Sequence, residues 1–131
     1  MVVNSEARIS PLSGWIRYNV VAVSGVVSAP GHNVNRVVQL GARFTDNGPH
    51  ARVVLHLTQL NLLTGAKTTL QTLDSDGFAS SADPQTQSAS ACAEPLDFQN
   101  DAYYIEAALT KTEADGNPIL FAVQLKPCSI L

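Results

Sequence analysis

Residues 37–49 read VVQLGARFTDNGP, and this stretch decides the fold. Its large apolar side chains fall at every second position, at Val38, Leu40, Ala42 and Phe44. Successive side chains of a β-strand point to opposite faces, so this alternation predicts a strand with one buried face. The closing DNGP predicts a turn, because Asn and Gly tolerate positive φ and Pro cannot continue a strand ladder.

The same period of two recurs along the chain. Alternation predicts further strands at residues 15–22, 53–58, 68–73, 103–110 and 119–125. A helix competes at residues 103–110, since Glu106 and its alanine neighbours are good helix formers and Asp101 is a suitable cap. The hairpin-type sequence DGNP at residues 115–118, followed by another alternating segment, favours the strand.

Residues 74–95 differ in composition from the alternating segments, because they are rich in Ser, Ala, Asp and Gln. They predict either a long surface loop or a loop around one weak edge strand near residues 86–93, and the second is favoured because long structureless loops are uncommon. Six or seven short strands predict an all-β fold, an antiparallel two-sheet sandwich of jelly-roll type. We expect a single domain over residues 1–131, with residues 1–12 as a flexible arm.

Composition restricts the partners. Only 15% of the 131 residues are charged, and the net charge is −3. A surface this poor in charge suits a secreted module or a subunit that packs against copies of itself, and it offers no basic stripe for nucleic acid. The uncharged residues 18–35 contain too many polar side chains for a membrane span.

Four segments carry a resemblance to known proteins: FTDN at residues 44–47, LNLLTGAKTTL at 60–70, LDFQN at 96–100 leading into YYI, and LFAVQL at 120–125. With them, residues 37–125 resemble uncharacterised bacterial β-sandwich modules that are jelly-roll-like. The shared segments are turns and core positions. The resemblance therefore implies a fold and carries over no active site.

The two cysteines, Cys92 and Cys128, are candidates for a disulfide. In an oxidising compartment a bridge would add about 3 to 4 kcal/mol of stability, and in the cytosol the same residues would be two buried thiols. The start of the chain shows no secretory signal, although a mature chain would look the same. We expect a secreted, cell-surface or virion-associated protein.

Two oxygen-rich loops are candidates for calcium. Asp74 and Asp76 resemble the opening of a calcium loop, and Asp97 and Asp101 lie in the second loop. The third acidic ligand and the closing Glu are missing from the first loop. Asp side chains in such connections also commonly accept hydrogen bonds from their own backbone. Apart from calcium, the sequence predicts no cofactor.

The three histidines are His32, His50 and His56. Imidazoles suit zinc or copper, but the spacing of these three matches no metal-binding motif, so exposed strand and loop positions are the simpler expectation.

No catalytic residue is predicted, because nucleophile elbow, phosphate loop and dinucleotide fingerprint are all missing from the sequence. The leading hypothesis is a non-catalytic structural or interaction module that self-associates through sheet faces or edges. Its outward positions are low in charge: Gln39, Gly41, Thr58, Thr69, Gln71 and Gln124.

Two alternatives stay open. A lectin-like carbohydrate-binding domain would use aromatic side chains as a sugar platform, and the candidates are Trp15, Tyr18, Tyr103 and Tyr104. A small β-barrel enzyme would need a deep apolar pocket of about 300 Å³ or more.

Overall fold

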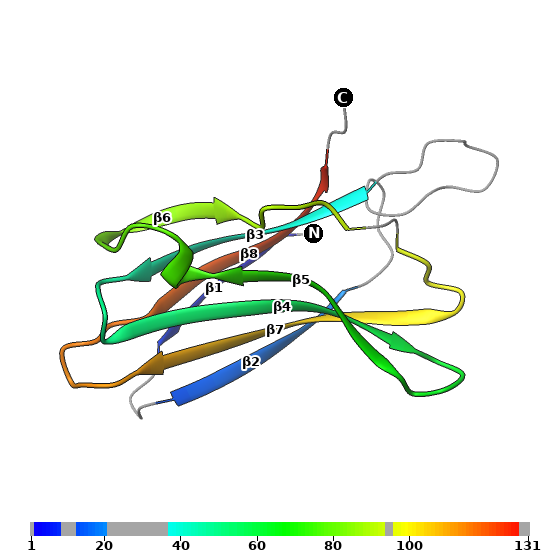
Figure 1. Ribbon diagram of the computed structural model, residues 1–131, viewed down its shortest axis with the longest axis horizontal. Coiled ribbons are helices and arrows are strands. Elements are labelled where there is room, and N and C mark those ends of the chain that lie inside the picture. The colour runs from blue at the N-terminus through cyan, green and yellow to red at the C-terminus, as the bar shows by residue number, and fades with distance from the viewer. Residues whose placement is uncertain (1, 9–12, 21–36, 94–95, 129–131) are drawn as a thin grey trace.

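The computed structural model describes residues 2–8, 13–20, 37–93 and 96–128. These residues form strands and one short 3₁₀ helix (Figure 1). The elements are β1 (Val2–Arg8), β2 (Ser13–Val20), β3 (Val37–Asp46), β4 (Ala51–Asn61), β5 (Lys67–Asp74), η1 (Ser75–Gly77), β6 (Ser81–Ser88), β7 (Asp101–Lys111) and β8 (Ile119–Cys128).

The strands form two four-stranded antiparallel sheets. Sheet A has the order β1-β8-β3-β6, and sheet B has the order β2-β7-β4-β5. The pairs β4–β5, β3–β6, β2–β7 and β1–β8 are nested about the β4–β5 turn, so the chain is one long hairpin rolled into two facing sheets. This is the strand order of a jelly roll, and the predicted all-β sandwich is confirmed.

The core lies between the sheets and follows the alternation of the sequence. Leu40 and Phe44 of β3 face Leu55 and Leu57 of β4, and all four side chains are almost fully buried. Residues 103–110 form β7, an inner strand of sheet B, so the predicted strand is correct and the competing helix is wrong. Its inward side chains are buried in the same core.

The weak strand of the Ser-rich region begins earlier than predicted. The structure places β6 at Ser81–Ser88, paired with β3, and beyond it Ala93 forms an isolated bridge to Val38. The edge position explains the difference, because most of the side chains of β6 are partly or fully exposed and the strand shows no apolar alternation. Pro84 is compatible with such an edge strand.

Residues 2–8, expected within a flexible N-terminal arm, form β1 and pair with β8. Residues 9–12 of that arm lie outside the described residues. No helix in the described part of the chain is long and apolar enough to cross a membrane.

The two ends of the sandwich differ in the segments that form them. The turn end consists of the β3–β4 turn at residues 47–50, η1, and the β7–β8 turn at residues 112–118. Figure 1 shows these two turns side by side, and a hydrogen bond from Asn47 Nδ2 to the Asp115 carbonyl (2.9 Å) joins them. The disulfide end consists of residues 89–93, the last residues of β8, and the part of β3 that lies between them.

Candidate functional site

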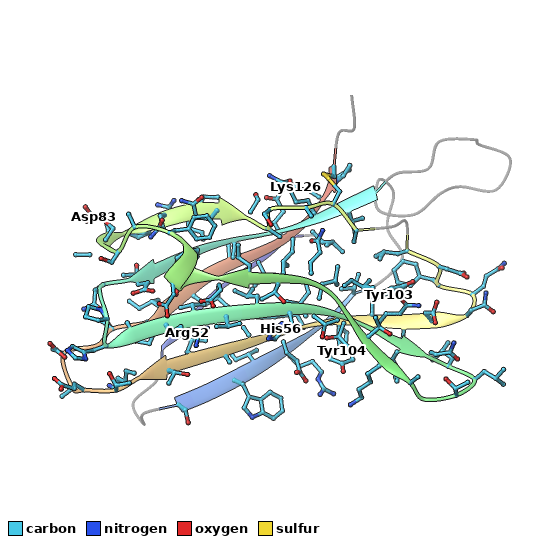
Figure 2. The ribbon with its side chains drawn as sticks, viewed as in Figure 1. Arg52, His56, Asp83, Tyr103, Tyr104 and Lys126 are labelled. Atoms are coloured by element: carbon cyan, nitrogen blue, oxygen red, sulfur yellow. A yellow bond between two sulfur atoms is a disulfide. The ribbon has the colours of Figure 1, made fainter. Side chains whose placement is uncertain are left out.

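The outer face of sheet B gathers side chains from all four of its strands. The strand register puts Arg17, Glu106, His56 and Thr72 in one row across the sheet. Neighbouring rows add Trp15, Val54, Tyr104, Thr58, Ala108, Arg52 and Asp74. Arg52 and His56 on β4 and Tyr104 on β7 are labelled in Figure 2.

Trp15 is the exposed large apolar side chain of this face. Its exposed fraction is 68%, because it projects from the edge strand β2 away from the core. The guanidinium carbon of Arg17 lies 5.9 Å from the Trp15 ring centroid and 4.4 Å from that of Tyr104. Arg17 also pairs with Glu106, its Nε donating to Oε1 at 3.1 Å. Stacking and ion pairing together hold this cationic side chain flat on the sheet.

The four aromatic residues proposed as a sugar platform do not share one surface. Trp15 and Tyr104 lie on the outer face, but Tyr104 is only 7% exposed, beneath Arg17. Tyr103 is 4% exposed and belongs to the core, where its hydroxyl accepts a hydrogen bond from the Asp97 backbone N–H at 2.8 Å. Burial raises the pKa of Tyr103. Tyr18 is half-buried and packs against the same core.

A second ion pair lies on the same face, toward the turn end. Arg52 Nε donates to Asp74 Oδ1 at 3.1 Å and lies 3.4 Å from Asp76 Oδ2. The hydrogen bond from Arg52 lowers the pKa of Asp74, whereas partial burial, with the nearby Asp74 charge, raises the pKa of Asp76.

The four acids predicted for calcium lie in two separate places. Asp74 and Asp76 are at the turn end, where Asp74 also caps η1 by accepting from the Asp76 backbone N–H. Asp97 and Asp101 are at the opposite end, where Asp97 precedes β7 and Asp101 is the first residue of β7. Asp97 accepts from Asn100 Nδ2, which lowers its pKa. Asp101 is buried, and its Oδ1 has no hydrogen-bond partner within the described residues.

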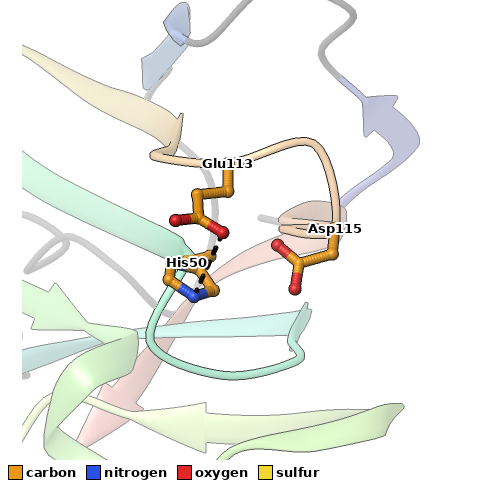
Figure 3. Close-up of side chains that lie close together, drawn as sticks. All are labelled: His50, Glu113 and Asp115. Carbon is orange, nitrogen blue, oxygen red and sulfur yellow. Dashed lines mark ion pairs between the residues drawn. The ribbon is translucent and has the colours of Figure 1, made fainter.

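The described histidines occupy different sites. His56 lies on the outer face of sheet B, its Nδ1 hydrogen-bonded to Thr72 Oγ1 at 3.0 Å, and His32 lies outside the described residues. His50, in the β3–β4 turn, is adjacent to Glu113 and Asp115 of the β7–β8 turn (Figure 3). Sequence reasoning missed this cluster, since its members come from two distant turns.

Surface hollows lie beside β5 and at the turn end. One of about 360 Å³ at the turn end is lined by Asp46, Gly48, Pro49, Asp76, Phe78 and Ser80. The lining combines two carboxylates and a hydroxyl with the apolar side chains of Pro49 and Phe78.

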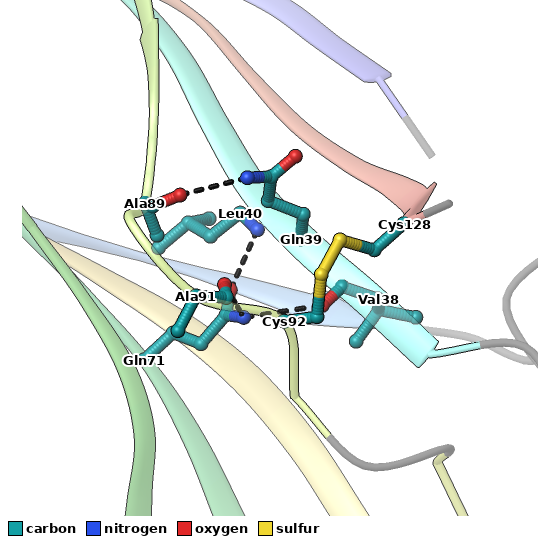
Figure 4. Close-up of a disulfide and its surroundings, with 8 residues drawn as sticks. All are labelled: Val38, Gln39, Leu40, Gln71, Ala89, Ala91, Cys92 and Cys128. Carbon is teal, nitrogen blue, oxygen red and sulfur yellow. Dashed lines mark hydrogen bonds between the residues drawn. A yellow bond between two sulfur atoms is a disulfide. The ribbon is translucent and has the colours of Figure 1, made fainter. Parts of the chain in front are cut away.

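At the disulfide end, Cys92 and Cys128 form a disulfide with their Cα atoms 6.0 Å apart (Figure 4). Beside it, Gln71 Oε1 accepts from the Leu40 N–H at 2.7 Å, and Gln71 Nε2 donates to the carbonyls of Val38 and Ala91. The expectation that Gln71 faces outward is therefore wrong. Gln71 lies opposite the core residue Leu57 and two positions from the buried Leu73, so the regular alternation of the strand turns its amide inward.

Comparisons with known proteins assign no family. No family model matches the chain, and no curated protein matches it. One similar solved structure is described as "Structure of infectious bursal disease virus Gx strain", with a TM-score of 0.43 and 8% sequence identity. The match covers 96% of this chain and 29% of that chain, so this protein spans less than a third of it. The eight strands within the described ranges define the class of the fold as a jelly-roll sandwich.

Proposed function

We propose that this protein is a non-catalytic structural module that associates with copies of itself through the outer face of sheet B. The observation that carries the proposal is Trp15, 68% exposed beside Arg17 and Tyr104. Trp, Tyr and Arg are the residues that most often dominate the binding energy of protein interfaces. Because burying the apolar surface of a Trp ring is strongly favourable, covering Trp15 with a partner would stabilise the complex.

The charges of this face are compatible with burial. Arg17 is paired with Glu106, and Arg52 with Asp74, within the same chain. Covering a charge that is already paired avoids the large penalty of burying an isolated one. Between the two pairs the face carries Val54 and Ala108, and Thr58 lies in the row beyond Glu106.

A second copy is the occupant that fits the face best. A two-fold interface sets one patch against itself, so the patch must carry both signs of charge. Arg17 and Arg52 supply positive charge, and Glu106 and Asp74 supply negative charge; Arg17 and Glu106 share one row of the sheet, and Arg52 and Asp74 lie in rows closer to the turn end. Sheet edges are weaker candidates at β6, because Asp83 and Pro84 oppose the addition of another strand.

Carbohydrate binding is the second candidate function, and Trp15 is again the residue that favours it. A single exposed ring beside charged groups can stack on a pyranose. However, the ring of Tyr104 is covered by Arg17, and Tyr103 belongs to the core. A broad aromatic platform is therefore not supported.

The test is light scattering coupled to size-exclusion chromatography over a concentration series. Wild type should dissociate only on dilution, and Trp15→Ser should weaken association by about tenfold or more, because truncating an interface Trp costs roughly 2 kcal/mol. Leu63→Ser is the matched control, since Leu63 is 93% exposed on the β4–β5 turn, outside the face.

A wild-type chain that is monomeric at high concentration would reject self-association. So would equal effects of the Trp15 and Leu63 variants. If a monomer instead binds immobilised glycans and loses that binding in Trp15→Ser, carbohydrate recognition is the function of the face.

The disulfide supports an oxidising location, and we propose that the protein is secreted, at the cell surface or part of a virion. Iodoacetamide should label neither cysteine in the unreduced protein as isolated from its source, and labelling of both would contradict the proposal.

Kinship with bacterial jelly-roll-like modules is part of the same proposal, supported by the strand order.

A further inference from the structure

Three potential metal ligands meet at the turn end of the sandwich. His50 lies just before β4, and Glu113 and Asp115 lie in the turn between β7 and β8. One ring nitrogen and one carboxylate oxygen from each acid all lie within 4.8 Å of one another (Figure 3). None of these three residues belongs to the face described above.

Hydrogen bonds from the Asn47 side chain and a close backbone contact fix the positions of the two turns. Asn47 donates to the Asp115 carbonyl and accepts from the Asn117 N–H at 2.8 Å. The Thr112 N–H donates to the His50 carbonyl at 3.0 Å. Gly116 lies so close to this carbonyl that a Cβ atom would be only 2.0 Å from its oxygen. The three side chains are therefore brought together by the protein itself, without a metal.

The imidazole of His50 is oriented for coordination. Its Nδ1 is 3.1 Å from Thr112 Oγ1, and its Nε2 is 3.6 Å from Glu113 Oε2. Metal-binding histidines almost always donate their other ring N–H to a neighbouring acceptor, which leaves the second nitrogen free for the ion. Ligands of a tetrahedral zinc ion lie about 2.0 to 2.2 Å from the metal and hence roughly 3.4 Å from each other, which is close to the 3.6 Å between His50 Nε2 and Glu113 Oε2.

We propose that His50, Glu113 and Asp115 bind a divalent transition-metal ion of the zinc class. One imidazole nitrogen with two carboxylate oxygens suits a borderline cation, whereas calcium prefers oxygen ligands alone. Two carboxylates balance the charge of a divalent ion. Glu113 and Asp115 are exposed, so the remaining coordination positions face water. A small cavity of about 70 Å³ beside His50 and Asp115 has room for such a water molecule.

Calorimetric titration of the disulfide-intact chain with zinc chloride tests the site. We expect saturable binding of one zinc ion per chain. His50→Ala, Glu113→Gln and Asp115→Asn should each weaken it by at least about tenfold. His56→Ala is the matched control, because its Nδ1 is also hydrogen-bonded to a threonine, but on sheet B. His32→Ala is the second control.

Variants of Thr112 distinguish an organised zinc site from non-specific zinc binding. Thr112→Val removes the hydrogen-bond partner of His50 Nδ1 and should weaken zinc binding several-fold, whereas Thr112→Ser should leave it unchanged. Thermal unfolding without metal confirms that the variants fold. In wild type, added zinc should raise the unfolding temperature, and it should not do so in Glu113→Gln.

Three outcomes would overturn the assignment. The first is no measurable binding of zinc. The second is binding that survives Glu113→Gln with Asp115→Asn but is lost in His32→Ala or His56→Ala. The third is a titration in which calcium chloride binds this site more tightly than zinc chloride.

Discussion

At the disulfide end, a covalent bond and a buried amide hold the chain together, whereas at the turn end exposed turns are held by hydrogen bonds. Cys92 joins Cys128, and Gln71 of sheet B bonds the backbone of β3 in sheet A (Figure 4). At the turn end, Asn47 joins two turns, and the ionisable side chains of His50 and Glu113 stay partly in water. The disulfide end therefore stabilises the fold, whereas the turn end holds at its surface the groups proposed to bind a cation.

The largest expected effect comes from removing the disulfide. Cys92→Ser with Cys128→Ser should lower the free energy of unfolding by about 3 to 4 kcal/mol, because the unfolded chain regains the entropy of an open loop. Urea unfolding of the variant measures the loss, and reduced wild type should show the same change. A loss below about 1 kcal/mol would mean that the covalent bond does not stabilise this end.

The second-largest effect on stability is expected from replacing Gln71, whose buried amide lies at the same end. Gln71→Leu should cost about 2 to 3 kcal/mol, since the Leu40 N–H loses its acceptor inside the sandwich and two carbonyls lose their donor. Gln124→Leu, on the outer face of sheet A, is the control and should change stability by less than about 0.5 kcal/mol. Equal losses in both variants would argue against a special role for the buried position.

The corresponding test at the turn end is Gly116→Ala. The new Cβ would lie 2.0 Å from the His50 carbonyl oxygen, so the turns must move apart, at a cost of about 1 to 2 kcal/mol. Gly77→Ala is the control, because nothing lies within 4 Å of its Cβ position. Urea unfolding measures both. If Gly116→Ala is neutral, the two turns are less tightly joined than the structure indicates.

The smallest effect concerns pH at the turn end. Because Arg52 lowers the pKa of Asp74, the native state gains stability above the unfolded pKa of about 4 and loses it as the pH falls through the lowered native value. At pH 7, Asp74→Asn should therefore cost about 0.5 kcal/mol, and the difference should vanish in acid.

Asp76→Asn should behave in the opposite way. The pKa of Asp76 is raised, so its ionisation opposes folding as the pH rises, and the variant should be neutral or slightly stabilising at pH 7. Urea unfolding between pH 3 and pH 7 measures both variants. Parallel pH profiles would contradict the opposite pKa shifts.

The strands were predictable wherever the inward positions are apolar and most outward positions are polar, as in β3, β4 and β7. Strand β6 was placed only approximately, because an edge strand with few buried side chains leaves no alternation to detect. The sequence places Thr69 and Gln71 on one face, but the irregularity in the β4–β5 pairing lies between them, so Thr69 faces outward whereas Gln71 faces inward with Leu73.

The sequence by itself determined the all-β sandwich and most of its core, because alternation is a local property of each strand. Only the tertiary structure decided which distant residues meet. It brought His50 beside Glu113, placed Arg17 over Tyr104, and joined Cys92 to Cys128. Each of these pairs is distant in the chain, and its contact depends on how the long hairpin rolls into two sheets, which no local pattern specifies.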